Sequence, residues 1–258
     1  MADRGGQTAG AGERLERPAF YALRAGGARD LVTLLHPPYT AWHLSYIALG
    51  AVAAPAIHLD RLLATLAAFF LAVGVAAHAL DELNGHPLET RLSDRSLLVL
   101  AAISLTGAIA IGIAGVFILS PTLAPFVVVG GFLVMAYNLE LAGGRFHTDF
   151  WFAAAWGAFP ALTSWWANTL EVKQMDELVA GALVATACFG LSVAQRRLST
   201  PVRELRRRTA TVRGEQMLVD GTAVPLSVES LARPLDGALQ ALSWAVVALA
   251  VGLVAVRL

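Results

Sequence analysis

The residues best suited to chemistry lie in one short segment, HALDELNGHPLETRLSD, between positions 78 and 94. Five of its side chains are candidate metal ligands: His78, Asp81, Glu82, His86 and Glu89. At about 100° per residue along an α-helix, four of them would lie within roughly 80° of one another, with Asp81 beside them. A face of carboxylates and imidazoles can bind a divalent cation. The spacing therefore predicts a metal site.

A simpler interpretation of the same segment stays open. Pro87 disfavours helix at the residue before it, so Glu89 and Asp94 would sit in a loop. The segment would then be a polar helix end that faces water, with Ser93 or Asp94 capping the next helix. The position beside a long apolar stretch favours the functional interpretation, because a charge at a membrane edge is costly unless it is paired or bound.

Two further groups could act on a substrate. Arginine forks bind phosphate oxygens in pairs, and Arg196 and Arg197 stand closest to an apolar stretch in the run AQRRLSTPVRELRRR. The alternative is that these arginines meet anionic lipid headgroups, at about 1 kcal/mol each. Tyr137 and Asn138 end another apolar stretch, and Trp156 lies in the middle of a third, where it could line a cavity for a lipid chain.

The elements that position these residues are predicted from composition. Of the 258 residues, 57% are hydrophobic and 15% are charged, and the mean hydropathy is +0.62. Long apolar stretches of this kind predict an all-α, polytopic membrane helix bundle with about seven transmembrane helices. The predicted spans are 39–57, 61–80, 96–119, 122–141, 150–167, 178–195 and 237–256. The formal net charge of zero does not indicate a nucleic-acid partner.

Charge asymmetry predicts the orientation. With the N-terminus inside, all of the 19 Lys and Arg residues except Arg61, Lys173 and Arg257 fall on the inner side, as cytoplasmic segments require. We therefore expect a multi-pass protein of the cell membrane with a cytoplasmic N-terminus and an outer C-terminus. The transmembrane domain would cover 39–258, with cytoplasmic loops at 81–95, 142–149 and 196–236.

The two remaining segments are polar. Residues 1–38 do not resemble a signal peptide, and we expect them to form a cytoplasmic tail that is partly disordered in the glycine-rich stretch from Gly5 to Gly12. Within the large loop, Gly214, Gly221 and Pro225 predict a small hairpin or lid over 199–235. No feature of the sequence indicates an oligomeric state.

Over roughly residues 36 to 200 the chain resembles the UbiA superfamily of intramembrane prenyltransferases. The resemblance rests on four motifs: His78-Ala79-Leu80-Asp81-Glu82 at the family's first aspartate-rich position, His86-Pro87-Leu88 at its Arg-Pro-Leu turn, Ala136-Tyr137-Asn138, similar to its Tyr-Ser stretch, and Ala155-Trp156-Gly157-Ala158-Phe159-Pro160, similar to its Gly-x-x-x-Pro stretch. The resemblance implies a UbiA-like fold. It also implies transfer of an isoprenyl group from an isoprenyl diphosphate to a lipophilic acceptor, with Mg²⁺ as cofactor.

The resemblance also implies roles for individual residues. Asp81 and Glu82 would chelate Mg²⁺ as the catalytic carboxylates, supported by His78, His86 and Glu89. Tyr137 would stand near the carbocation as the third catalytic residue. The substrate-binding residues would be Arg145, Arg196, Arg197, Asn138 and Trp156.

The chain departs from the family pattern, which leaves two alternatives open. The second aspartate motif is missing; AQRRLSTPVRELRRR, with Glu204 as its one acidic residue, stands in its place, and seven spans replace the usual nine. One alternative is a non-catalytic protein of the same fold that binds a prenyl lipid, a quinone or a protein partner. The other is an enzyme with Zn²⁺ or iron at a cluster of imidazoles and a carboxylate, formed by His36, His78, His86, His147 and Glu82.

Overall fold

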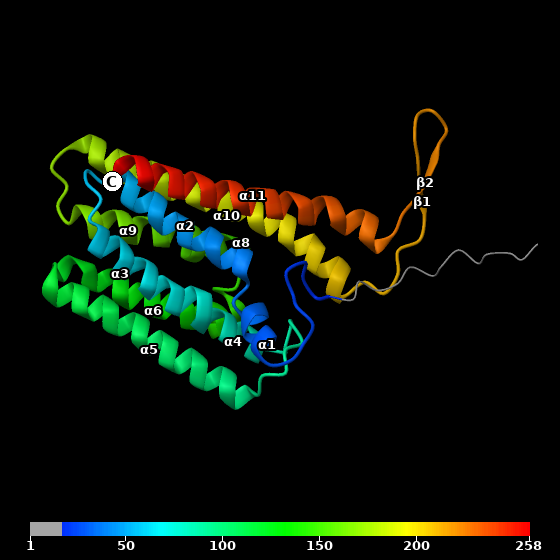
Figure 1. The fold of residues 1–258 in the computed structure, drawn as a ribbon, viewed down its shortest axis with the longest axis horizontal. Coiled ribbons are helices and arrows are strands. Elements are labelled where there is room, and N and C mark those ends of the chain that lie inside the picture. The colour runs from blue at the N-terminus through cyan, green and yellow to red at the C-terminus, as the bar shows by residue number, and fades with distance from the viewer. Residues whose placement is uncertain (1–16) are drawn as a thin grey trace, which may run out of the picture.

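The computed structural model describes residues 17–258, which form a bundle of helices that run side by side along the long axis of the molecule (Figure 1). Within these residues seven long helical segments alternate in direction. They are α2 (Pro37–Ala53), a continuous rod of α3 (Leu59–Phe69), η1 (Phe70–Ala77) and α4 (His78–Leu83), α5 (Asp94–Ile118), η2 (Pro121–Leu123) with α6 (Ala124–Asn138), a second rod of α8 (Asp149–Ala153), η3 (Ala154–Ala158) and α9 (Phe159–Thr169), α10 (Met175–Arg207) and α11 (Val228–Arg257). The short helices α1 (Ala28–Leu34) and α7 (Leu141–Gly144) complete the set.

Five of the helices in the described part of the chain are long and apolar enough to cross a membrane. These are Leu59–Leu83, Asp94–Ile118, Pro121–Asn138, Met175–Arg207 and Val228–Arg257. The chain is therefore an all-α membrane protein, as its composition predicts. Helix α2, with 17 residues, and the α8–η3–α9 rod are not among the five, so the number of seven spans stays a prediction.

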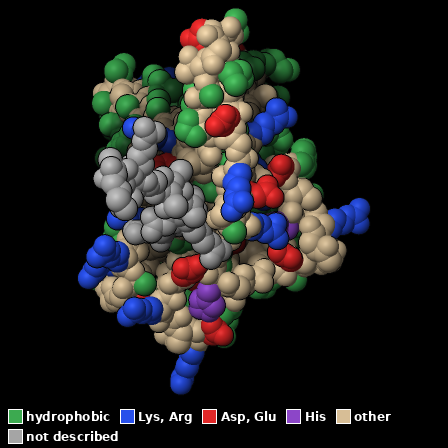
Figure 2. All heavy atoms as spheres, turned by 90° about the vertical axis from the view of Figure 1, so that its right-hand side faces the viewer, with side chains coloured by type: hydrophobic (Ala, Val, Ile, Leu, Met, Phe, Trp, Pro, Cys, Tyr) green, Lys and Arg blue, Asp and Glu red, His purple; other side chains and the backbone are tan. Residues whose placement is uncertain are grey.

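The connections between the long segments alternate between the two ends of the bundle. Residues 17–36 and the connections 84–93, 139–148 and 208–227 share one end, which we call the loop end, and the C-terminus lies at the other (Figure 1). Figure 2 shows the loop end face on, with arginine, carboxylate and histidine side chains gathered across it. Two of its helices begin with a serine cap, because Ser93 accepts a hydrogen bond from the Ser96 backbone and Ser227 one from the Ser230 backbone.

Helix α10 is longer than predicted, and the loop expected at 196–236 is correspondingly shorter. The helix continues to Arg207 and α11 begins at Val228, so the arginines from Arg196 to Arg207 are helical. The reason lies in the buried side chains of α10, which keep a spacing of three and four residues past the expected end. They are Cys188, Ser192, Gln195, Ser199 and Val202.

The connection between α10 and α11 contains the predicted small hairpin, which the structure confirms. Strand β1 (Glu215–Met217) pairs antiparallel with β2 (Ala223–Pro225), and Gly221 takes the positive φ of 84° in the turn between them. All six strand residues are exposed. The hairpin extends away from the bundle beyond the loop end (Figure 1), and its role as a lid stays a prediction.

The segment of residues 17–36, which we call the strap, packs on the loop end. Ala19 and Ala22 are buried with Leu88, and the Thr33 hydroxyl accepts a hydrogen bond from the Leu23 backbone. Asp30 accepts hydrogen bonds from the backbones of Gly26 and Arg91, which ties the strap to the connection 84–93. The disorder predicted for Gly5 to Gly12 falls outside the described residues.

Candidate functional site

A polar cavity lies at the loop end, between the strap, α2, the α3–η1–α4 rod, α6, α8, η3, α10 and α11. It measures about 940 Å³, including space open to solvent. The ionisable side chains that line it are Tyr21, His36, Tyr39, His43, His78, Asp81, Tyr137, His147, Arg196, Arg203, Arg207 and Asp236. The sequence segments that supply them are as far apart as the strap and α11, so only the folded bundle brings them together.

The arginines of this cavity, Arg196, Arg203 and Arg207, all come from the last third of α10. Arg196 donates through Nε to Asp149 Oδ1 at 2.8 Å, and its guanidinium carbon lies 5.2 Å from the centre of the Phe152 ring. Arg203 lines the cavity two turns further along the same face of α10, and its Nη2 lies 3.4 Å from Thr200 Oγ1. Among residues 17–258 no carboxylate lies within ion-pair distance of Arg203. Its charge is therefore available to an anion.

The next arginines of α10 hold neighbouring segments. Arg206 pairs with the buried Asp236 of α11 and donates to the Arg17 carbonyl. Arg207 lines the cavity and donates to the Pro18 carbonyl at 3.4 Å. These contacts attach the strap to the basic face of α10, so the strap covers the arginine side of the cavity.

Two stacked histidines, His36 and His78, form another part of the wall of the polar cavity. The rings of His36 and His78 lie 4.0 Å apart at an angle of 14°. His78 Nδ1 lies 3.1 Å from the Gly74 carbonyl oxygen, one turn earlier in the helical rod. His36 Nε2 is buried and has no hydrogen-bond partner. Burial, together with the nearby His78 and Arg207, holds the pKa of His36 well below its usual 6.5.

Both π-helical segments of the described chain border this cavity. Val73 and Ala77 belong to η1, which ends directly before His78, and Trp156 belongs to η3. A π-helical segment shifts the register of all side chains after it, and such segments are frequent at functional sites. His78 and Asp81, which line the cavity, follow directly after η1.

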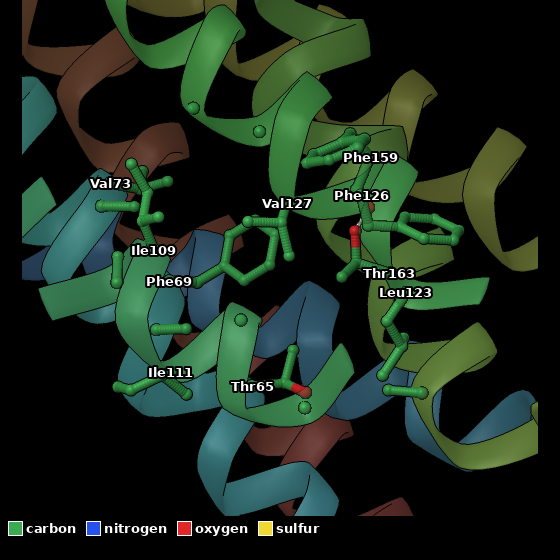
Figure 3. Close-up of a pocket in the computed structure, with 18 of the residues that line it drawn as sticks. Thr65, Phe69, Val73, Ile109, Ile111, Leu123, Phe126, Val127, Phe159 and Thr163 are labelled. Atoms are coloured by element: carbon green, nitrogen blue, oxygen red, sulfur yellow. Dashed lines mark hydrogen bonds between the residues drawn. The ribbon is translucent and has the colours of Figure 1, made fainter. Parts of the chain in front are cut away.

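A second, apolar cavity adjoins the first. It measures about 920 Å³, including open space, and lies between the α3–η1 part of the rod, α5, α6 and the η3–α9 part of the second rod. Figure 3 shows its labelled side chains, which are almost entirely hydrocarbon apart from the hydroxyls of Thr65 and Thr163. Val73 and Trp156 line both cavities. An amphiphile could therefore place a polar head in one cavity and an apolar chain in the other.

The apolar cavity runs along the α3–η1–α4 rod. It extends to Arg61, twelve residues before Val73 in the same rod, which is roughly 18 Å at the helical rise of 1.5 Å per residue. Half of the hydrocarbon core of a bilayer is about 15 Å thick. The lining of the cavity along this rod is thus slightly longer than half of the hydrocarbon core.

Six of the residues predicted for the site do line the polar cavity: His78, Asp81, Tyr137, Asn138, Trp156 and Arg196. Tyr137 stacks on His147 at 4.5 Å and meets Trp156 edge to face at 5.5 Å, both measured between ring centres. Asn138 is buried and donates to the Val134 carbonyl. These residues come from several different helical segments, and the structure places them around one space.

The other five predicted residues lie elsewhere. Glu82 is completely buried, and its two carboxylate oxygens accept hydrogen bonds from the Leu88 backbone, the Thr90 backbone and the Thr90 hydroxyl. His86 Nε2 lies 2.9 Å from Asp94 Oδ1 in the connection 84–93. The remaining three, Glu89, Arg145 and Arg197, are exposed and do not line the cavity.

The single metal-binding face predicted for these carboxylates and imidazoles is therefore not formed. The helix ends at Leu83, and Gly85, His86 and Glu89 take positive φ values, so residues 86 and 89 do not continue its face. Within residues 17–258 no group of three or more His, Cys, Asp or Glu side chains could hold a metal ion. Of the cavity's carboxylates, Asp236 is already paired with Arg206. The donors present do not fit Mg²⁺, which prefers several oxygen ligands. The cluster of histidines and Glu82 considered for Zn²⁺ or iron does not form such a group within the described residues either.

Sequence reasoning missed Arg203 and Arg207, and it left His43 and Gln195 without a role. His43 Nε2 and Gln195 Oε1 lie 3.1 Å apart and connect α2 with α10 in the buried core. The signal that could have revealed the arginines is the helical spacing of Arg196, Arg203 and Arg207, which fall on one face when α10 is continued to its observed end.

The chemistry available here is the binding of an anion by guanidinium groups, of a neutral polar group by imidazoles and of an apolar chain by hydrocarbon. Guanidinium forks match the oxygens of phosphate. Two aromatic rings that pack edge to face lie where the cavities meet: Trp156 lines both cavities and Tyr137 lines the polar one. No family model, no curated protein and no solved structure matches this chain.

Proposed function

We propose that this protein binds an isoprenyl diphosphate in the two adjoining cavities and, as a UbiA-like membrane prenyltransferase, transfers the isoprenyl group to a lipophilic acceptor. The observation that carries the proposal is that a polar and an apolar cavity lie next to each other and share Val73 and Trp156 in their linings. Such a space suits a molecule with an anionic head and a long hydrocarbon chain. An isoprenyl diphosphate has this form.

The arginine side of the polar cavity supports the placement of the head. Arg203 is mostly enclosed and has no carboxylate partner among the described residues, which is costly in the absence of a bound anion. Arg196 and Arg207 line the same space. Together these side chains can bind diphosphate oxygens at several points.

The junction of the cavities supports a role in transfer. In the proposed reaction the bond between C1 of the prenyl chain and the diphosphate oxygen breaks, and the electron pair leaves with the diphosphate. Arg196 and Arg203 stabilise that negative charge, and the π faces of Tyr137 and Trp156 stabilise the positive charge that develops on the prenyl group. The acceptor then forms the new bond to C1 and releases a proton. The donors present in the cavity do not fit Mg²⁺, so the proposed role of the arginines does not rest on a metal.

A second function is favoured by one specific observation. No metal-binding group of three or more donors occurs in residues 17–258, and metal-assisted ionisation is what the resemblance to prenyltransferases implies. Without a metal to assist ionisation, the same two cavities would bind a prenyl lipid or a quinone and would not transfer a prenyl group. Formation of a prenylated product from a labelled isoprenyl diphosphate and an added acceptor separates this function from the transferase.

The test of the proposal is a fluorescence titration of the purified protein with geranylgeranyl diphosphate, with and without Mg²⁺. Because Arg203→Gln removes the unpaired guanidinium of the cavity, we expect it to weaken binding about tenfold or more, as the loss of one charge-assisted contact implies. Arg197→Gln is the matched control, since Arg197 lies on the same helix but is exposed and outside the cavity.

An equal loss in the two variants would contradict the proposal, because it would indicate attraction by the basic surface rather than binding in the cavity. An unchanged affinity in Arg203→Gln would contradict it as well. Binding to the wild-type protein that persists without Mg²⁺ would support the arginine-based site.

A further inference from the structure

The strap has a side that the bundle leaves uncovered. Three large apolar residues on this side are exposed, Leu23 at 41%, Leu31 at 47% and Val32 at 44%. Two arginines that lie between them along the chain, Arg24 and Arg29, are exposed as well. We call these five residues the outer strap face. Apolar and basic side chains are therefore interleaved on one short segment.

The opposite side of the strap is turned into the protein. In α1 the buried residues are Asp30, Thr33 and Leu34, which follow the helical spacing of three and four residues. Asp30 is the only acidic residue of the strap, and its carboxylate accepts hydrogen bonds from the Gly26 and Arg91 backbones. Because this one negative charge is buried, the outer strap face carries positive charge alone.

The two arginines of the outer strap face have no acidic partner in the described part of the chain. No carboxylate of residues 17–258 lies within ion-pair distance of Arg24 or Arg29. An exposed arginine of this kind is attracted to anionic lipid headgroups when it lies near a membrane surface. The position of the strap relative to the membrane spans therefore decides what this face meets.

Helix α1 lies where two of the candidate membrane spans reach the loop end. These spans are Leu59–Leu83 and Asp94–Ile118. Leu34 of α1 is buried in one cluster with Leu80 and Leu97, each of which lies about one turn from the loop end of its span. Figure 1 shows α1 beside α4. A segment at the end of two spans lies at the level of the lipid headgroups.

Headgroup level suits both kinds of side chain on the outer strap face. Leucine and valine side chains are unfavourable in water, whereas a guanidinium group is unfavourable in hydrocarbon. Helices that lie in the plane of a membrane surface combine an apolar side, which enters the headgroup region, with basic residues that attract anionic lipids. The outer strap face has both features.

We propose that the outer strap face docks on the membrane surface at the loop end and binds lipids with anionic headgroups there. This inference goes beyond the proposed function and does not depend on it. The inner side of the same strap forms part of the wall of the polar cavity, through residues such as Phe20 and Tyr21. Docking therefore holds this part of the wall between the bundle and the lipid surface.

The experiment measures how close the strap lies to lipid. Ala28→Cys places a thiol at an exposed position of α1, one turn before Leu31 and Val32, and the natural Cys188 is buried. The thiol is labelled with an NBD fluorophore, and the full-length protein is placed in nanodiscs of phosphatidylcholine alone or of equal parts phosphatidylcholine and phosphatidylglycerol. A phosphatidylcholine with a spin label near its headgroup quenches the fluorophore on contact. We expect about threefold stronger quenching with phosphatidylglycerol, because anionic lipid holds the basic strap on the surface.

Two double variants separate the contribution of charge from that of apolar contact. Arg24→Gln combined with Arg29→Gln should abolish the increase that phosphatidylglycerol causes, because no basic side chain of the outer strap face remains. Leu31→Ser combined with Val32→Ser should lower the quenching in both kinds of nanodisc, because the apolar side no longer enters the headgroup region. All four positions are exposed.

The matched control is Arg208→Gln combined with Arg213→Gln, which removes two exposed arginines of the loop end outside the strap and should keep the increase. Equal quenching in the two lipid compositions, or an increase that persists in the double variant at Arg24 and Arg29, overturns the inference. Loss of the increase in the control overturns it as well, because that result indicates attraction by the whole basic end. No prenyl diphosphate is present, so a failure here does not count against the proposed function.

Discussion

At the scale of single residues, the neighbours Asp81 and Glu82 have different surroundings. Asp81 lines the polar cavity, while Glu82 is completely buried and points into the connection after α4. Its carboxylate accepts three hydrogen bonds from Leu88 and Thr90. A carboxylate that accepts several hydrogen bonds from a loop holds the loop in place. Glu82 is therefore a structural residue in this fold.

We expect Glu82→Ala to destabilise the protein by about 3 kcal/mol, because two buried backbone N–H groups would lose their partner. The measurement is thermal unfolding in detergent, with Glu89→Ala as a control at an exposed position of the same connection. The affinity for geranylgeranyl diphosphate should stay within about twofold in the fraction that remains folded. A variant that unfolds like the wild-type protein but loses the ligand would show that Glu82 acts in binding.

At the scale of elements, the α3–η1–α4 rod lines both cavities. Ala64, Ala68 and Ala72 line the apolar cavity at intervals of four residues, and His78 and Asp81 line the polar one after the π-helical segment. Small side chains on the rod leave the space that α5, α6 and α9 enclose. The length of chain that fits is therefore set by side-chain volume along this face.

Filling that face should change which prenyl chain binds. We expect Ala68→Phe to weaken the binding of geranylgeranyl diphosphate about tenfold and to leave the shorter geranyl diphosphate almost unaffected, because Ala68 lies between Val73 and the far end at Arg61. Competitive titration with the two diphosphates measures the ratio. The control is Ala67→Phe, at an exposed position that does not line the cavity. Equal losses for both chain lengths would place the chain elsewhere.

At the scale of the whole molecule, the ends of the bundle differ in charge. The loop end contains the arginine-rich part of α10, the strap and the connections 84–93 and 139–148, and Figure 2 shows charged side chains across it. The opposite end has short connections at 54–58 and 170–174. We propose that the loop end faces the cytoplasm, since cytoplasmic segments collect Lys and Arg.

The orientation can be tested with single cysteines, because the one natural cysteine, Cys188, is buried. In intact cells a membrane-impermeant maleimide should label Lys173→Cys, which replaces an exposed residue at the end opposite the loop end. Val219→Cys, at the exposed tip of the hairpin, should react only after the membrane is permeabilised. The reverse pattern would place the loop end outside the cell.

The sequence by itself determined the features that depend on neighbouring residues. Long apolar stretches predict helices that can cross a membrane, and five of the described helices are long and apolar enough to do so. Gly214, Gly221 and Pro225 predict the hairpin that β1 and β2 form. These signals are local, because helix length and turn geometry depend on the residues of one segment.

Only the tertiary structure decided which polar side chains meet. A regular helical repeat puts Glu82, His86 and Glu89 on one face, but the helix ends at Leu83 and the side chains separate. The π-helical segments η1 and η3 shift the register of the residues after them, and a period of 3.6 residues does not include such a shift. The approach of Arg203, His36 and Trp156 to one cavity depends on packing between helices that are far apart in the sequence. No local pattern records that packing, and for this reason the candidate site emerged from the fold.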